Sequence, residues 1–169
     1  MLKKLFSKRK DTTSNNSANA IVKAPIKGKI LSLEEVPDET FASKMLGDGI
    51  AIEPSEGLVC SPIDGEVIQL FLPSKHAVCV KSDDGVEVLI HIGIDTVKMN
   101  GDGFEALVNT GDRVVEGQEL IRFDIDKVKS NAKTSITPVV ITNSFDYEKI
   151  DVLDNGTISI GEELLSINK

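Results

Sequence analysis

The chain has 169 residues and a formal net charge of −8, and this length fits one domain with a substantial core. Aromatic residues make up only 4% of the chain and tryptophan is absent, which argues against a base-stacking surface for single-stranded nucleic acid. The acidic balance also argues against a nucleic-acid partner, because such binding needs many lysine and arginine side chains to neutralise phosphates.

The first ten residues differ in charge from the rest of the chain. They carry five basic side chains and no acidic one, whereas residues 11–169 have a balance of −13. Such a segment, with its apolar residues on one side of a helical wheel, is typical of weak contact with an anionic membrane surface. A solubilising tail explains the same residues equally well. The apolar residues are Met1, Leu2, Leu5 and Phe6.

The sequence divides into three parts: a basic amphipathic tail over 1–10, a flexible linker over 11–19, and one folded domain over 20–169. No apolar run reaches the roughly 18 residues of a membrane span, and no secretory signal follows the N-terminal charges. Cys60 and Cys79 are too few for a disulfide framework. We therefore expect a cytoplasmic protein, associated peripherally with the inner face of the membrane.

From residue 20 onward the pattern is that of an all-β protein. Short apolar runs alternate with clusters of Gly, Pro, Asp and Asn, which favours a compact antiparallel β-sandwich or a partly open barrel. The helical segments are few, a short one over 126–133 and a looser turn around 41–46. The expected strands cover 28–33, 49–52, 58–60, 65–71, 77–81, 86–92, 113–115, 119–123, 138–142, 156–160 and 163–167.

A short motif occurs twice in the first half of the domain. Pro-Ile-x-Gly stands at 25–28 and again at 62–65, a displacement of 37 residues. In both copies proline removes a backbone donor and glycine permits a sharp corner before a strand. Two copies indicate a duplicated half-motif rather than a repeat array, which would need at least about three.

The two histidines of the chain lie at the ends of two neighbouring apolar runs. His91 stands within the most apolar stretch, 86–97, and His76 precedes the run 77–82. If these runs pair as a hairpin about the turn at 83–85, both histidines fall at its open end. Either histidine alone could be a core residue with satisfied ring nitrogens, but two at one place predict a site.

The residue types at this place favour phosphoryl chemistry without a metal. Two histidines are fewer than the three protein ligands of a catalytic zinc, so a zinc ion at His76 and His91 would need a partner's carboxylate, and no cofactor is required. Neutral imidazole is a good nucleophile near pH 7. His91 could attack through one nitrogen while a backbone carbonyl near Gly93 holds the proton on the other. His76 could donate to a phosphoryl oxygen, oriented by Ser74.

Seven stretches, in order along 20–169, carry a specific likeness to a known family. They are Val36-Pro37-Asp38, residues 47–52, 62–65, His76-Ala77, 86–97, 101–104 and 137–141. Through them the chain resembles the glucose-family enzyme IIA of the bacterial phosphoenolpyruvate-dependent sugar phosphotransferase system. The resemblance implies a compact antiparallel β-sandwich and a phosphotransferase component that works through a phosphohistidine intermediate. It leaves regulatory binding of other proteins open.

The resemblance also implies roles for individual residues. His91 would be phosphorylated by the carrier protein HPr and would pass the group to a cysteine on a glucose-class enzyme IIB domain of a membrane sugar permease. His76 would be its partner, and Ser74 keeps a hydroxyl where some members carry threonine. Asp38 and Asp95 would face basic side chains of the partners. The surrounding apolar patch would comprise Phe41, Met45, Leu46, Phe71, Val78, Leu89 and Val97.

A carrier module of the biotinyl or lipoyl type is the alternative from another class. Residues 111–120 resemble the Gly-Asp-x-Val-x-x-Gly-x-x-Leu turn of those β-sandwiches, and Lys98 stands beside Met99. Such carriers, however, have about half this length and present their lysine as Met-Lys-Met or Asp-Lys-Ala. Neither triplet is present here.

Overall fold

The computed structural model describes residues 19–169, so the predictions for the tail over 1–10 and for most of the linker lie outside the described residues. The strands are β1 (Ala20–Lys23), β2 (Gly28–Leu31), β3 (Asp48–Pro54), β4 (Leu58–Cys60), β5 (Gly65–Leu70), β6 (Ala77–Ser82), β7 (Glu87–His91), β8 (Phe104–Ala106), β9 (Arg113–Val114), β10 (Glu119–Phe123), β11 (Thr137–Ile141), β12 (Lys149–Val152), β13 (Thr157–Ile158) and β14 (Glu163–Asn168). The helices are α2 (Glu39–Ala42) and α3 (Ile125–Asn131), with 3₁₀ turns η1 (Leu33–Glu35), η2 (Thr96–Met99) and η3 (Ser144–Asp146).

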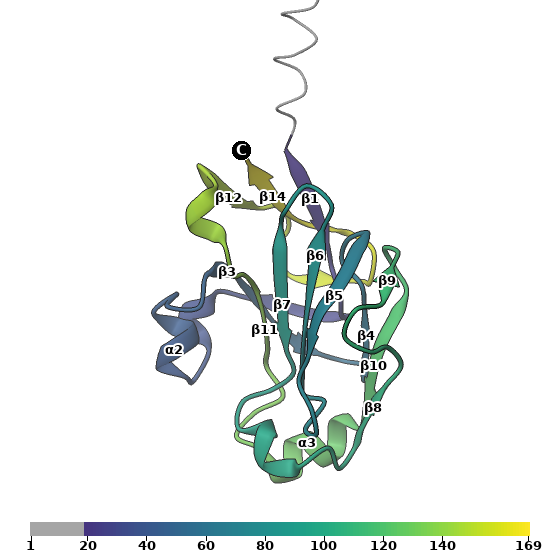
Figure 1. Ribbon diagram of the computed structural model, residues 1–169. Helices are drawn as coiled ribbons and strands as arrows, with labels where there is room; N and C mark the ends of the chain where they lie inside the picture. Colours follow the sequence, from purple (N-terminus) through teal and green to yellow (C-terminus); the bar gives the residue numbers. More distant parts are fainter. Residues whose placement is uncertain (1–18) are drawn as a thin grey trace, which may run out of the picture.

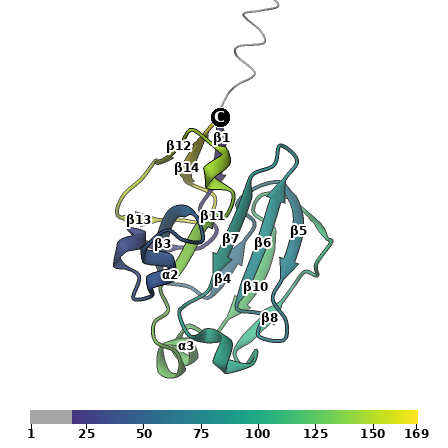
Figure 2. The same ribbon diagram turned by 60° about the vertical axis from the view of Figure 1, so that its left-hand side comes forward.

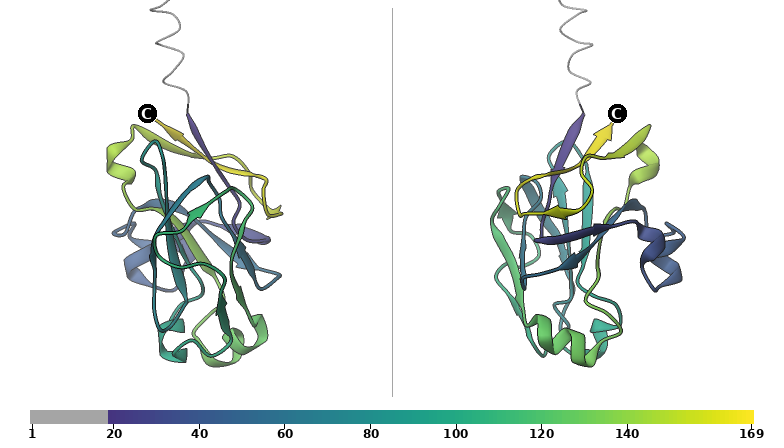
Figure 3. Two further views of the ribbon diagram at one scale, coloured as in Figure 1. Left: turned by 45° about the vertical axis from the view of Figure 1, so that its right-hand side comes forward. Right: turned by 180° about the vertical axis from the view of Figure 1, so that it is seen from behind.

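Three antiparallel sheets form the sandwich, which confirms the predicted all-β class. The large sheet has the order β13-β2-β3-β11-β7-β6-β5-β9, and the two small ones are β1-β14-β12 and β4-β10-β8. The first small sheet lies at the end of the molecule that holds the C terminus, and α3 closes the opposite end (Figure 1). The second lies behind β7, β6 and β5 (Figure 2). Helix α2 projects at the side (Figure 3).

The two faces of the β6–β7 hairpin have different surroundings. Val78 pairs with Ile90 and Val80 with Val88, and these four side chains belong to the main core between the sheets. Side chains at alternate positions along a strand point to opposite faces, so the intervening residues lie on the outer face. There Ala77, Cys79 and Leu89 join a second apolar cluster, which also contains Phe41 of α2 and Val140 of β11. The second cluster supports the end of the hairpin where His91 stands.

Each copy of the Pro-Ile-x-Gly motif leads into a strand of the large sheet, and its glycine is the first residue of that strand. Gly28 starts β2 and Gly65 starts β5. A Cβ atom on Gly28 would lie 2.0 Å from the Glu53 carbonyl oxygen, and one on Gly65 would lie 2.1 Å from that of Lys81. Each glycine therefore allows a close approach to the neighbouring strand that any side chain would block.

The helices begin slightly earlier than the sequence predicts, because carboxylates cap their first turns. Asp124 accepts a hydrogen bond from the Lys127 N–H, so α3 covers Ile125–Asn131 rather than 126–133. Asp38 likewise caps α2, which ends at Ala42 and leaves most of 41–46 as turns. Within residues 19–169, no helix is long and apolar enough to cross a membrane.

Candidate functional site

The two histidines meet at one end of the β6–β7 hairpin, as the sequence predicts. His91 is the last residue of β7 and pairs with Ala77, the first residue of β6, which directly follows His76. The Ile92 N–H continues the ladder by donating to the His76 carbonyl at 2.7 Å. The two ring centroids are 4.7 Å apart with the planes at 84°. The hairpin register therefore fixes the spacing of the two imidazoles.

The backbone beyond β7 decides which nitrogen of His91 carries its proton. Nδ1 lies 2.8 Å from the carbonyl oxygen of Gly93. A carbonyl oxygen can only accept, so Nδ1 holds the hydrogen and Nε2 keeps a free lone pair. Burial lowers the pKa of His91, and the Gly93 hydrogen bond and the negative charge of Asp38 oppose that shift. The result is a neutral, partly exposed imidazole with its nucleophilic nitrogen away from the backbone.

His76 is held by a hydroxyl and is more thoroughly buried. Ser74 Oγ lies 2.5 Å from His76 Nδ1, and both residues are buried. Burial, followed by the proximity of His91, lowers the pKa of His76 from 6.5 to about 4. His76 is therefore neutral at pH 7. In the arrangement where Ser74 donates to Nδ1, the proton of His76 is on Nε2 and is free to be donated to an oxygen.

Two phenylalanine rings frame the histidine pair. Phe41 lies 4.9 Å from His91 between ring centroids, and Phe71 lies 5.9 Å from His76. Phe41 comes from α2, a helix of four residues whose first turn is capped by Asp38 through a 2.9 Å bond from the Thr40 N–H. A carboxylate that shapes this helix thus also places an aromatic ring against His91.

The structure exposes only part of the predicted apolar patch. Met45, Leu46 and Val97 are exposed large hydrophobic residues, and Phe71 is partly exposed. Phe41 and Leu89 are buried in the second apolar cluster, against which Phe71 packs. The patch prediction is wrong for Val78.

Val78 is fully buried in the main core, because it occupies the opposite face of β6 from Ala77 and Cys79. Leu72, which was not among the predicted patch residues, is 66% exposed and directly follows Phe71 in the chain. An apolar residue directly before Pro73, in the turn ahead of His76, is the signal that would have identified it.

The two predicted partner-facing carboxylates lie on different segments around His91. Asp38 precedes α2, and its charge acts on the His91 ring. Asp95 lies in the turn after β7 with φ +64° and forms an ion pair of 3.7 Å with Lys98. Lys98, the residue on which the carrier-module alternative depends, belongs to η2 and not to the tip of a β-hairpin.

Metal binding by this site would need ligands beyond those that residues 19–169 bring together. Among residues 19–169 there is no group of three or more His, Cys, Asp or Glu side chains that could hold a metal ion. Both Nδ1 atoms are engaged by Gly93 and Ser74, so the pair offers two Nε2 atoms. A tetrahedral zinc site would need two further ligands.

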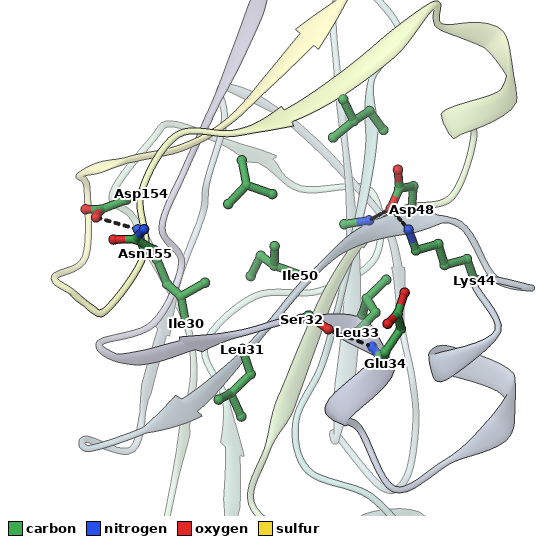
Figure 4. A pocket seen from close by; sticks show the side chains of 13 residues that line it. Ile30, Leu31, Ser32, Leu33, Glu34, Lys44, Asp48, Ile50, Asp154 and Asn155 are labelled. Atoms are coloured by element: carbon green, nitrogen blue, oxygen red, sulfur yellow. Dashed lines mark hydrogen bonds and ion pairs between the residues drawn. The ribbon is translucent and has the colours of Figure 1, made fainter.

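A pocket of about 360 Å³ lies between β2, η1, β3 and the segment around β12 (Figure 4). Ile30, Leu31 and Ile50 give it apolar walls, and an ion pair of 3.4 Å between Lys44 and Asp48 stands at its edge. Neither histidine lines it. The site chemistry is therefore separate from this pocket.

Comparison with known proteins identifies relatives along almost the whole described chain. The family model described as "phosphoenolpyruvate-dependent sugar phosphotransferase system, EIIA 1" matches residues 20–147. A glucose-specific EIIA component of this transport system from Staphylococcus epidermidis is 46% identical over 162 residues, which cover 96% of this chain and 95% of that protein. A glucoside-specific EIICBA component from Staphylococcus carnosus is 48% identical over 149 residues, which cover 88% of this chain and 21% of the longer relative.

A solved structure shows the same fold. Glucose permease IIA from Mycoplasma capricolum superposes with a TM-score of 0.82 at 34% sequence identity. The match covers 88% of this chain and 95% of that one.

Proposed function

The chain belongs to the EIIA 1 family of the phosphoenolpyruvate-dependent sugar phosphotransferase system, and we propose that His91 carries a phosphoryl group from phospho-HPr to a glucose-class enzyme IIB domain. Membership in the family makes the protein a phosphotransferase component of sugar uptake. The observation that carries the finer assignment is the hydrogen bond from His91 Nδ1 to the Gly93 carbonyl, because it leaves Nε2 as a nucleophile.

In the first transfer the lone pair of His91 Nε2 attacks the phosphorus of phospho-HPr. The nitrogen–phosphorus bond of the donor breaks, and its electron pair returns to the donor imidazole. Positive charge develops on the His91 ring, so the Nδ1–H bond to Gly93 becomes charge-assisted and strengthens during the step. An interaction that is stronger in the transition state than in the ground state raises the rate.

In the second transfer a thiolate of the IIB domain attacks the same phosphorus. The bond to Nε2 breaks, and the electron pair returns to His91. His76 donates from Nε2 to a phosphoryl oxygen, and Ser74 keeps that donor in place. Because its pKa is about 4, His76 acts as a neutral hydrogen-bond donor at pH 7 and not as a cation.

Partner docking uses the exposed part of the apolar patch and the two carboxylates. Met45, Leu46 and Val97 provide apolar area, and Asp38 and Asp95 provide negative charge for basic partner side chains. The relative from Staphylococcus carnosus supports a IIB partner, since its name combines the letters C, B and A in one component. We place the protein in the cytoplasm beside the permease, with residues 1–10 in weak contact with the membrane.

Neither transfer requires a metal. A zinc ion held by the two Nε2 atoms and a partner's carboxylate would occupy the nitrogen that attacks phosphorus and the nitrogen that donates to it. Zinc binding and phosphoryl transfer would therefore exclude each other.

The test is incubation with phosphoenolpyruvate, enzyme I and HPr, followed by measurement of intact mass. The wild type gains one phosphoryl group, which is labile in acid and stable in base. A His91→Gln variant gains none. An acid-stable label of the phosphoserine kind, or equal labelling of the variant, would contradict the proposal.

A further inference from the structure

The peptide unit between Ile92 and Gly93 is held at both of its polar ends by threonine hydroxyls. Thr96 Oγ1 donates to the Ile92 carbonyl oxygen at 2.6 Å. Thr137 Oγ1 accepts from the Gly93 N–H at a long 3.4 Å and donates to the Ser135 carbonyl at 3.0 Å. The two hydroxyls come from η2 and β11, which flank the turn after β7. The peptide is thus fixed from two sides.

Both threonines stand where an apolar residue would be the ordinary choice. Each has no solvent-exposed surface, and valine has nearly the same shape. A hydroxyl in such a place is unfavourable unless it is hydrogen-bonded, so its presence indicates a specific task for the bond. The bonds concern the one peptide that directly precedes the Gly93 carbonyl, which receives the proton of His91 Nδ1.

Packing on Gly93 strengthens the same constraint. Gly93 has φ +66°, and a Cβ atom there would lie 2.8 Å from Cγ2 of Thr96 and 2.7 Å from the carbonyl oxygen of Thr134. The Ile94 N–H donates to that same carbonyl oxygen at 3.0 Å. The Thr96 methyl group therefore occupies the space that a side chain at position 93 would need, and its hydroxyl holds the Ile92 carbonyl.

We propose that Thr96, assisted by Thr137, is a positioning residue that aims the Gly93 carbonyl at His91 Nδ1 and thereby selects the ring tautomer that can be phosphorylated. This inference rests on the proposed phosphorylation of His91. Neither threonine touches the phosphoryl group. Without the Thr96 hydroxyl the Ile92–Gly93 peptide can rotate, and the carbonyl of Gly93, which follows it, turns away from Nδ1. Part of the His91 population then carries its proton on Nε2, where the proton blocks attack.

A matched pair of substitutions separates the hydroxyl of Thr96 from its methyl group. Thr96→Val keeps the methyl group and removes the hydroxyl, whereas Thr96→Ser keeps the hydroxyl and removes the methyl group. Thr142→Val is the control, because it removes a threonine hydroxyl that bonds Glu87 at 3.3 Å, away from the histidines. Amide spectra and thermal melts establish that each variant is folded.

The first readout is the tautomer of His91 in the full chain, measured by ¹⁵N NMR of the imidazole without any partner. Wild type, Thr96→Ser and Thr142→Val show one tautomer with the proton on Nδ1. Thr96→Val shows a mixture, and its His91 titrates at a lower pH because a hydrogen bond that favours the charged ring has been lost. A folded Thr96→Val protein with the wild-type tautomer would overturn the proposal.

The second readout is the single-turnover rate of phosphorylation by phospho-HPr. We expect Thr96→Val to be slower by up to about 100-fold, the loss that a misplacement of about 1 Å in a reacting site can cause. Thr96→Ser should stay within about threefold of wild type. If Thr96→Val fails to fold, Thr137→Val shows the same changes to a smaller degree, and a wild-type result for it would refute the role of the hydroxyls. Failure of wild type itself to become phosphorylated would contradict the proposed function, but the tautomer measurement would still test the role of Thr96.

Discussion

Replacement of His76 by glutamine is the most revealing perturbation of the site, because it removes the ring and keeps a neutral donor. His76 has a pKa of about 4, so about one molecule in a thousand is protonated there at pH 7. The substitution therefore removes little charge. It changes the position of one hydrogen-bond donor, which Ser74 now fixes through Nδ1.

The expected size of the effect differs between the two half-reactions. Loss of one well-placed donor to a developing oxyanion commonly costs about 3–4 kcal/mol, or on the order of 10²–10³ in rate. The onward transfer should show that loss, because the leaving imidazole nitrogen and the incoming thiolate must lie in line on opposite sides of the phosphorus. Phosphorylation of His91 by phospho-HPr should persist, since the covalent bond forms at His91 Nε2.

Rapid-quench single-turnover measurements on the two half-reactions provide the assay. His76→Gln should accept the phosphoryl group from HPr and pass it to the IIB cysteine about 10²–10³ times more slowly than wild type. Ser74→Ala is the matched control for orientation and should slow the onward step in the same direction by less. If His76→Gln donates as fast as wild type, His76 has only a packing role and the assignment is refuted.

Three other predictions concern stability, the turn and the tail. His76 binds a proton more weakly in the folded protein than in the unfolded chain, so the free energy of unfolding should fall as the pH drops from about 6.5 towards 4. The loss should be about 3 kcal/mol, at 1.36 kcal/mol per pKa unit. Urea titrations of His76→Gln should show a smaller loss over this pH range, and a loss equal to that of wild type would contradict this cause. Gly93→Ala should lower stability by about 2 kcal/mol or more and slow phosphorylation, since its Cβ would lie 2.7 Å from the Thr134 oxygen; unchanged urea midpoints and rates would contradict this. Deletion of residues 1–15 should leave phosphorylation by HPr intact and weaken binding to anionic vesicles, whereas equal vesicle binding with and without the tail would exclude the membrane contact.

The class of fold could be predicted from the sequence because strand and turn signals are local. Gly, Pro and Asp clusters separate the runs, and two strands, Leu58–Cys60 and Glu119–Phe123, have the predicted bounds. Strands β1, β8 and β12 were missed. They have three or four residues each, and pairing with distant segments stabilises them, as in the pairing of Lys149 with Asn168.

The histidine pair could be predicted because a hairpin converts a sequence spacing into a distance. His91 pairs with Ala77 in the β6–β7 hairpin, so His76, the residue before Ala77, lies beside His91. The face on which a side chain lies depends on the register, and there the prediction was wrong for Val78, which lies in the core. The resemblance to the family identified Val78 as a patch residue without regard to the strand. Successive side chains of β6 point to opposite faces of the sheet, so Val78 and Ala77 lie on different faces.

The role of Thr96 could not be inferred from spacing. Its hydroxyl donates to the Ile92 carbonyl, four residues earlier in the chain. The sequence alone is equally consistent with a threonine that only packs in the core as a β-branched residue. Thr137 stands 44 residues from its partner Gly93, in a strand whose apolar pattern conceals one buried hydroxyl. Only the folded arrangement shows that both hydroxyls serve a single peptide.

We propose that the neutral His91 ring, whose proton is held on Nδ1 by the hydrogen bond to the Gly93 carbonyl, reacts through Nε2. This assignment can be tested by ¹⁵N and ³¹P NMR of the ¹⁵N-histidine-labelled protein after phosphorylation by phospho-HPr. We expect a phosphorus–nitrogen coupling to Nε2 of His91, with Nδ1 still protonated. A coupling to Nδ1, or a phosphoryl group on any residue other than His91, would contradict it.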